Sequence, residues 1–175
     1  MRLLLHMCCA PCTTYSQKHF RQLGYEVRGF FYNPNIHPFK EYEMRLQTLE
    51  KYCRDKDIQL TVENDYNLEN YLSLVLDNLD SRCVSCYSLR LNETARQASL
   101  AGIPSFSTTL AISPYQNHEL LIQKGKEAGH LYNVDFVYED LRPGYRESVT
   151  ESRTLGLYRQ SYCGCIFSEK ERFCK

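Results

Sequence analysis

The densest chemistry in the sequence is the segment Cys8–Cys12, which reads CCAPC and holds three thiols. It follows the apolar run Leu3–Leu5, which predicts a short buried strand. Pro11 suits the first turn of a helix, because its missing N–H would be unpaired there anyway. The thiols are therefore expected at a strand-to-helix turn beside the positive end of a helix, where thiolate is favoured. Adjacent cysteines do not easily form an unstrained bridge, but both can face one metal cluster.

A second pair, Cys83 and Cys86, has helical i,i+3 spacing, so that both sulfurs share one face. Together with Cys8 and Cys9 this pair offers four thiolates, enough for a tetrahedral zinc or an iron–sulfur cluster. The same spacing is also typical of a thioredoxin-type redox pair or of a chance pair in the core. Cys12 is either a support beside the ligands or a third reactive thiol.

A third pair, Cys163 and Cys165, is separated by one glycine. A disulfide between them would close a small strained ring, and strained bridges are the reducible ones. As a dithiol the pair can hold two electrons; as an alternative, it supplies metal ligands. Cys53 has the spacing of a helix face that points into a core, and Cys174 is expected to be inert.

Other polar residues give weaker signals. His37, in a loop with two prolines, is a possible proton donor, and Asp65 and Asp140 are possible acids or hard metal ligands. For each of these residues the alternative is an ordinary solvated or capping side chain. The chain also has 14 tyrosines, a residue type that suits stacking on an unpaired RNA base.

Composition is that of one ordinary globular domain over residues 1–175, with 43% hydrophobic and 24% charged residues. The nine cysteines are odd in number and clustered, which in a reducing compartment favours metal or redox chemistry over structural disulfides. The N-terminal apolar run is too short for a secretion signal, and no apolar span predicts a membrane helix. We therefore expect a cytoplasmic protein. Because the formal net charge is +0, binding to nucleic acid would require a local basic patch.

The elements that must position these residues alternate along the chain. Strands are predicted at about 3–7, 25–32, 58–62, 105–110 and 134–138, and helices at about 11–22, 39–56, 67–79, 82–101, 117–129 and 147–156. This alternation predicts an α/β fold with a parallel sheet and helices on both faces. Ligands of such sheets bind beyond the carboxyl ends of the strands. The site is therefore expected near Cys8, Asn33, Thr108 and Asp140.

Five motifs, in order along nearly the whole chain, resemble the QueH family, the cobalamin-independent epoxyqueuosine reductases. They are Cys8–Cys12, Tyr32–Pro38 with Glu41-Tyr42, Arg82–Leu91, Phe106–Leu110 with Ser113–Tyr115, and Tyr158–Cys165. The one small departure is Asn33, where we expect family members often to carry Asp.

The resemblance implies a single Rossmann-like (HUP-like) domain and the last step of queuosine biosynthesis. Epoxyqueuosine at the wobble position (34) of tRNA is reduced to queuosine, and the epoxide oxygen leaves as water. It further implies that a [4Fe-4S] cluster is held by Cys8, Cys9, Cys83 and Cys86. The pair formed by Cys163 and Cys165 is implied to be a redox-active disulfide.

Removal of the epoxide oxygen requires two electrons and two protons. Asp140, Asp65 and His37 are the first candidates for the acid, and the sequence does not identify the external electron donor. A cluster held by four cysteines has no open iron. Binding of the oxygen to iron would therefore need a three-cysteine cluster or a second, mononuclear iron, for which Cys12, Asp65 and Asp140 are spare ligands.

Two other functions compete with this one. The first is a zinc-binding nucleotide hydrolase, whose protein would be colourless. The second is a thiol–disulfide oxidoreductase without a cluster, which would use Cys163 and Cys165 alone. Candidate phosphate contacts for a tRNA partner are Arg82, Arg90, Lys124, Lys126, Arg142, Arg146, Arg153 and Arg159.

Overall fold

A computed structural model describes residues 1–174. Its centre is one sheet of five parallel strands in the order β3-β2-β1-β4-β5. The strands are β1 (Arg2–His6), β2 (Glu26–Phe31), β3 (Leu60–Val62), β4 (Ser105–Thr108) and β5 (Asp135–Phe136). The predicted parallel α/β fold is confirmed.

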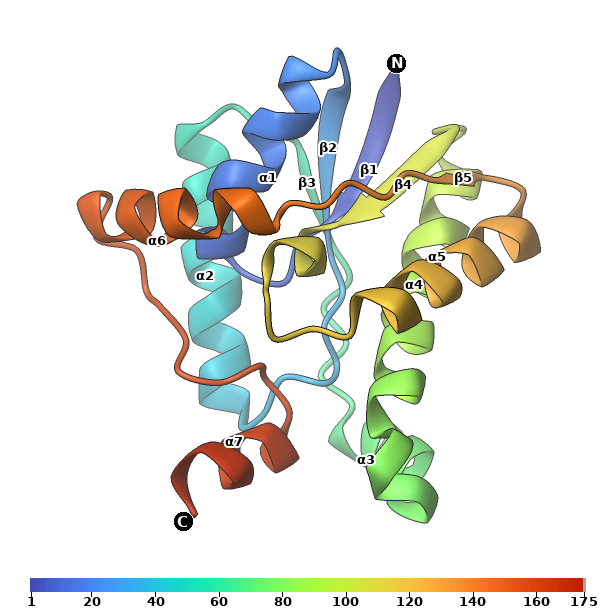
Figure 1. The fold of residues 1–175 in the computed structure, drawn as a ribbon, viewed down its shortest axis with the longest axis vertical. Coiled ribbons are helices and arrows are strands. Elements are labelled where there is room, and N and C mark those ends of the chain that lie inside the picture. Colours follow the sequence, from blue (N-terminus) through green and yellow to red (C-terminus); the bar gives the residue numbers. More distant parts are fainter. Residues whose placement is uncertain (175) are drawn as a thin grey trace.

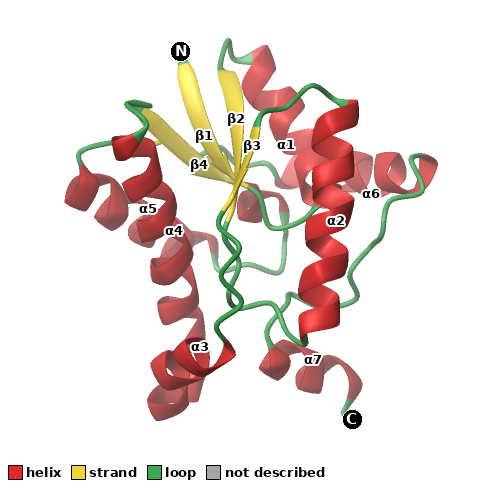
Figure 2. Ribbon diagram, turned by 180° about the vertical axis from the view of Figure 1, so that it is seen from behind, coloured by secondary structure: helices red, strands yellow, loops and turns green. Residues whose placement is uncertain are grey.

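Helices connect the strands and cover both faces of the sheet. They are α1 (Ala10–Gln22), α2 (Phe39–Asp55), α3 (Leu68–Val75), α4 (Arg82–Leu100), α5 (His118–Tyr132), α6 (Tyr145–Thr154) and α7 (Ile166–Phe173). Figures 1 and 2 show α1, α2 and α6 on one side of the sheet and α4 and α5 on the other. No helix within residues 1–174 is long and apolar enough to cross a membrane.

The central strand β1 is buried on both faces. Leu3 and Leu5 are fully buried on alternate positions, and Leu4 between them is 5% exposed. This explains the unbroken apolar run, since a strand covered on both sides needs no polar alternation. Each buried leucine contributes about 1.5–3 kcal/mol through loss of water contact. Cys53 is also buried, so the prediction of a core position is confirmed.

Several predicted boundaries were wrong, because local turns replace the ends of regular elements. The strand expected at 105–110 ends at Thr108, whose Oγ1 accepts a hydrogen bond from the Leu110 N–H at 3.1 Å. This bond starts the 3-10 turn η2 (Thr109–Ile112). The helix expected at 67–79 continues after Val75 as the 3-10 turn η1 (Leu76–Ser81), and another short turn, η3 (Arg142–Gly144), precedes α6.

The order of the strands fixes where a ligand can bind. The chain crosses from β1 to β2 on one side and reaches β4, on the other side of β1, later in the chain. Helices therefore diverge from the carboxyl end of β1 and leave a crevice there, as in other doubly wound sheets. Cys8 lies two residues beyond this end, at the mouth of the crevice.

Candidate active site at the carboxyl end of the central strand

Three sulfurs meet where β1 turns into α1. The Sγ atoms of Cys8, Cys9 and Cys12 all lie within 4.8 Å of one another. Cys9 is the N-cap residue of α1 and Pro11 stands in its first turn, as predicted from the sequence. The three cysteines are free thiols, and the Sγ atoms of Cys8 and Cys9 are 3.7 Å apart. This group can hold a metal ion or one corner of a cluster.

The three thiols differ in the direction in which their surroundings shift their pKa. Hydrogen bonds from Cys12, Cys9 and the Thr109 hydroxyl hold the pKa of Cys8 well below its ordinary value, although burial opposes this. Burial raises the pKa of Cys9, and the hydrogen bond to Cys8 raises that of Cys12. The surroundings therefore favour the thiolate most at Cys8, and the thiolate is the form that binds metals.

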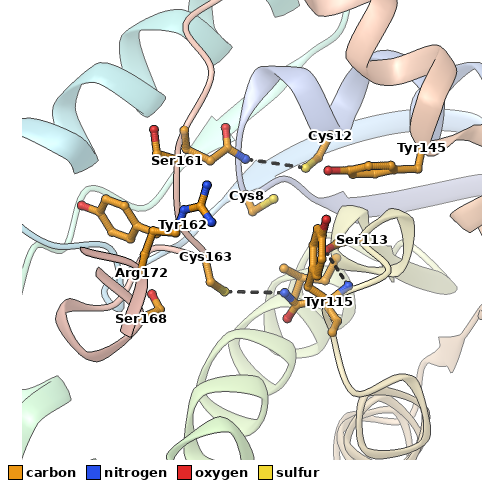
Figure 3. Close-up of a pocket in the computed structure, with 13 residues that line it drawn as sticks. Cys8, Cys12, Ser113, Tyr115, Tyr145, Ser161, Tyr162, Cys163, Ser168 and Arg172 are labelled. Carbon is orange, nitrogen blue, oxygen red and sulfur yellow. Dashed lines mark hydrogen bonds between the residues drawn. The ribbon is translucent and has the colours of Figure 1, made fainter. Parts of the chain in front are cut away.

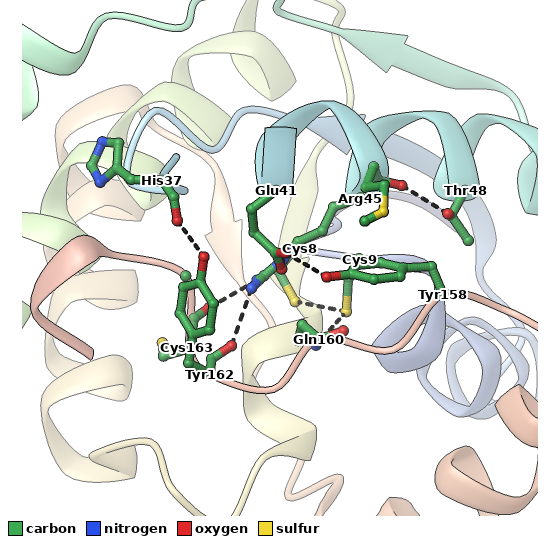
Figure 4. Close-up of polar contacts among 12 residues, drawn as sticks. Cys8, Cys9, His37, Glu41, Arg45, Thr48, Tyr158, Gln160, Tyr162 and Cys163 are labelled. Carbon is green, nitrogen blue, oxygen red and sulfur yellow. Dashed lines mark hydrogen bonds and ion pairs between the residues drawn. The ribbon is translucent and has the colours of Figure 1, made fainter. Parts of the chain in front are cut away.

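Gln160, from the C-terminal part of the chain, lies against the sulfur group. Its Nε2 donates to Cys9 Sγ at 3.0 Å (Figure 4) and lies 3.9 Å from Cys12 Sγ. Gln160 stands within the motif Tyr158–Cys165, but the sequence predicted no role for it, because it lies 151 positions from Cys9. The side-chain amide of Gln160 therefore supplies a hydrogen-bond donor to the sulfur of Cys9.

A cavity of about 510 Å³ opens beside the sulfur group (Figure 3). Cys8 and Cys12 lie on one wall, and Cys163 lies on the opposite wall. The other residues that line it are Leu110, Ser113, Tyr115, Gln116, Tyr145, Gln160, Ser161, Tyr162, Ser168 and Arg172. Its volume is within the range of small-molecule sites. Three tyrosines and three serines line the cavity with the sulfurs, so it offers both ring faces and hydroxyl groups to a ligand.

The thiols of Cys163 and Cys165 differ in their exposure to solvent. Cys163 is exposed and its Sγ accepts a hydrogen bond from Gln116 Nε2 at 3.6 Å. Cys165 is buried at the start of α7, where its Sγ accepts the Ser168 N–H at 3.4 Å. The exposed thiol faces the cavity and the buried one lies behind it. A redox-active role for the pair stays a prediction.

Cys83 and Cys86 lie in the first turns of α4, outside the group formed by Cys8, Cys9 and Cys12. Cys83 is exposed and Cys86 is buried, and burial raises the pKa of Cys86 to about 12. The other thiols that influence both residues are Cys163 and Cys165. Within residues 1–174, no group of three closely spaced ligand atoms includes Cys83 or Cys86. The four-cysteine ligand set therefore also stays a prediction.

A buried cation, Arg90, lies between the two sets of sulfurs. Its side chain is 1% exposed, and its Nη2 donates to Cys86 Sγ at 3.1 Å. Burial opposes its charge, but Cys86, Cys163 and Cys8 raise the pKa of Arg90 above its ordinary value. Among the described residues it forms no ion pair with a carboxylate. The prediction that Arg90 contacts phosphate was wrong, because solvent does not reach it.

The three candidate acids do not line the cavity. Asp140 is exposed and accepts two hydrogen bonds from the Arg142 guanidinium, which lowers the pKa of Asp140 to about 2. His37 is 1% exposed, its ring nitrogens have no hydrogen-bond partner in the described chain, and burial lowers its pKa to about 4. Asp65 is half-buried near Tyr42. Asp140 is thus ionised and His37 neutral at neutral pH, and neither can then donate a proton readily.

Tyr145 is a donor that the sequence analysis did not single out. Its hydroxyl points toward Cys12 in Figure 3, and burial raises the pKa of Tyr145 above its ordinary value. The hydroxyl is therefore protonated at neutral pH. Tyr115 meets Tyr145 edge-to-face with the ring centroids 6.3 Å apart. The two rings form one side of the cavity.

A parallel α/β sheet with a thiol-lined cavity at its switch point defines a class of site in which cysteines serve as metal ligands or redox groups. The comparison with known families identifies the protein family. The family model described as epoxyqueuosine reductase QueH matches residues 3–171. The chain belongs to the QueH family.

Two relatives show how complete this similarity is. The epoxyqueuosine reductase QueH of Dehalococcoides mccartyi is 42% identical over 174 residues, covering 99% of this chain and 96% of its own length. The QueH of Thermotoga maritima is 38% identical over 180 residues, covering 97% of this chain and 91% of its own length.

A solved structure, a predicted subunit of a tRNA methyltransferase from Methanocaldococcus jannaschii, superposes with a TM-score of 0.58 at 11% identity. The match covers 86% of this chain and 74% of that chain. At this identity the structural likeness supports the fold alone.

Proposed function

We propose that this protein reduces epoxyqueuosine at the wobble position (34) of tRNA to queuosine, the last step of queuosine biosynthesis. The chain would act as one catalytic domain. Membership of the QueH family supports this activity. The structural observation that supports it most is that Cys8, Cys12 and Cys163 line one shared cavity. Because the substrate is a tRNA, we also propose that the protein works in the cytoplasm.

The electrons and protons of the reaction balance with the Tyr145 hydroxyl and the Cys163 thiol, which line the cavity, and with the Cys165 thiol behind them. Both C–O bonds of the epoxide break, a C=C bond forms in the cyclopentane ring, and the oxygen leaves as water after taking two protons. The Cys163 and Cys165 thiols can supply two electrons by forming a disulfide, which an external reductant must then reduce. The Tyr145 hydroxyl is our candidate for a proton donor to the oxygen.

The donor set fits a thiolate-bound metal centre. Three sulfurs lie within 4.8 Å of one another, and Cys8 carries a lowered pKa. We propose that Cys8 and Cys9 are ligands of a [4Fe-4S] cluster. The cluster is completed by Cys12, or by Cys83 and Cys86, in which case Cys12 is free for a second, mononuclear iron. When bound, such a cluster passes single electrons, and an iron with an open position polarises an oxygen.

The location of the modified base makes this cavity accessible. The wobble base lies in the single-stranded anticodon loop, so it can leave its stack without melting of a duplex. Tyr115 at the rim is 83% exposed and offers a ring face to a base. Gln160 lies against the sulfurs, and Tyr162 lines the cavity next to Cys163 in the chain. The epoxide can thus reach the sulfurs while the rest of the loop stays outside.

The decisive test is anaerobic incubation of iron-loaded protein and a chemical reductant with tRNA that carries epoxyqueuosine. We expect nucleoside mass analysis to show the loss of one oxygen. Protein loaded with zinc in place of iron should leave the nucleoside unchanged. Unchanged epoxyqueuosine with the iron-loaded protein would contradict the proposal. A colourless protein that releases a nucleotide would instead support the zinc hydrolase.

Tyr115→Ala is expected to weaken tRNA binding on the order of 10-fold, because stacking on one base contributes about 1–3 kcal/mol. The measurement is Kd by filter binding over a series of salt concentrations. Tyr115→Ala should keep the dependence of log Kd on log salt concentration. The control variant Arg172→Gln, on the same cavity, should lower that slope by about 1 if it removes a phosphate contact. An unchanged Kd for Tyr115→Ala would exclude a stacking role.

A further inference from the structure

The segment Tyr158–Gly164 carries two groups of the site but has no helix or strand of its own. Its Gln160 donates to Cys9 Sγ at 3.0 Å, and its Cys163 faces the cavity from the opposite wall. An irregular segment of this kind must be held by side chains from elsewhere if its thiol is to keep one position. The first turns of α2 provide these side chains (Figure 4).

Arg45 of α2 is the main contact to the segment. Its side chain is 1% exposed, which makes it one of the largest fully buried side chains. Its Nη1 donates to the Cys163 carbonyl at 2.9 Å and its Nη2 to the Tyr162 carbonyl at 3.1 Å. Its Nε donates to Glu41 Oε1 at 2.7 Å. The planar guanidinium thus joins α2 to the two backbone carbonyls that flank the Cα of Cys163.

Further contacts hold both ends of the segment. At its start, the Tyr158 hydroxyl donates to the second oxygen of Glu41. Near its end, the Tyr162 hydroxyl donates to the His37 carbonyl, and the His37 N–H donates to the Gly164 carbonyl at 2.8 Å. A Cβ on Gly164 would lie 3.3 Å from Arg45 Nη1, so the backbone approaches the arginine closely.

We propose that Arg45, oriented by Glu41, is a positioning residue that holds the Cys163 backbone so that its thiol faces Cys8 and Cys12. This inference rests on the proposed function and deepens it. Lysine cannot replace arginine here, because an ammonium group cannot bond two carbonyls and a carboxylate in the fixed directions of a guanidinium. Only the backbone of Cys163 is bonded to Arg45, so the thiol itself stays free to react.

The first experiment compares Arg45→Lys with the native protein in two measurements. The turnover of epoxyqueuosine tRNA should show kcat lowered on the order of 10- to 100-fold with KM within about 2-fold, because a small displacement of a reacting group costs this much. The equilibrium of Cys163 and Cys165 with glutathione disulfide, which yields the protein disulfide and two glutathione molecules, should shift by at least about 10-fold. Arg54→Lys, an exposed arginine on the same helix, should change neither.

Tyr158→Phe keeps the ring and removes only the hydroxyl that bonds Glu41, so it tests the inference in a protein that folds even if Arg45→Lys does not. We expect a smaller shift of kcat and of the glutathione equilibrium in the same direction. Native values in both measurements for Tyr158→Phe and Arg45→Lys would overturn the inference. A decrease in kcat that is only proportional to the fraction of unfolded protein would also overturn it. The glutathione measurement needs no tRNA, so it stands even if the proposed function fails.

Discussion

Cys8→Ser is expected to abolish the proposed metal binding and to lower epoxyqueuosine reduction by more than about 100-fold, since even changes next to metal ligands cost 10- to 100-fold. Cys8 is the member of the sulfur group whose pKa its neighbours hold below the ordinary value. Its Sγ accepts a hydrogen bond from the Thr109 hydroxyl at 3.4 Å. A serine hydroxyl does not ionise at neutral pH and is a poor ligand for a soft metal site.

The measurement is the iron and sulfide content per chain after anaerobic loading, together with absorption near about 400 nm, where iron–sulfur clusters absorb. Cys174→Ser is the control, because Cys174 is exposed and lies outside the sulfur group. Retention of iron by Cys8→Ser would contradict a ligand role for the CCAPC segment.

The same measurement decides between the two ligand sets. Cys8 and Cys9 belong to both, so only Cys12→Ser and Cys83→Ser discriminate between them. Loss of the cluster in Cys12→Ser alone would support the compact group that the structure shows. Loss in Cys83→Ser would support the four-cysteine set, and α4 would then have to bring its sulfurs nearer to Cys8 when the metal binds.

Arg90→Met is expected to lower the free energy of unfolding of the metal-loaded protein and to leave that of the metal-free protein equal or higher. Arg90 is a buried cation that donates hydrogen bonds to the sulfur and the carbonyl of Cys86 and, in the described chain, forms no ion pair with a carboxylate. Its charge is balanced when the sulfurs are thiolates on a metal. Removal of the cation then leaves buried negative charge without compensation, which costs about 3–5 kcal/mol. When the sulfurs are neutral thiols, a methionine of similar length avoids the cost of burying a cation, and the free energy of unfolding should stay equal or rise.

The test for Arg90 is the free energy of unfolding by urea, measured under anaerobic conditions with and without metal. Arg90→Lys serves as the matched control, because it keeps the charge and loses the fork of hydrogen bonds. It should lose less stability than Arg90→Met in the metal-loaded form. An equal loss in both forms for Arg90→Met would show that the arginine serves packing alone.

The fold was largely predictable because its signals are local. The apolar run Leu3–Leu5 and the proline after it placed β1, the turn and α1 within a few residues of their observed bounds. The spacing of apolar residues in α2 placed Cys53 in the core. The ends of strands were less predictable, because single contacts such as the Thr108 cap decide them.

The candidate site was predictable only in part, because its remaining members are fixed by contacts between distant segments. Gln160 belonged to a recognised motif but had no assigned role, and Arg45 belonged to none. The path of residues 158–164 past α2 brings Gln160 to Cys9 and the Cys163 carbonyl to Arg45. His37 was expected in a solvated loop or as an acid, but aromatic rings from Tyr66 and Tyr71 enclose it. Sequence spacing does not encode such enclosure.

The two cysteine-bearing walls of the cavity come from early and late parts of the chain, so they are synthesised at different times. One wall comes from residues 8–12, and the other comes from residues 160–172, after all five strands. A nascent chain can therefore complete its sheet while the cysteines of the first wall are still uncovered and open to oxidants or to a metal donor. The segment with Gln160 follows both the first wall and the sheet in the chain, so a metal that reaches the sulfurs before this segment folds over them does not have to displace Gln160.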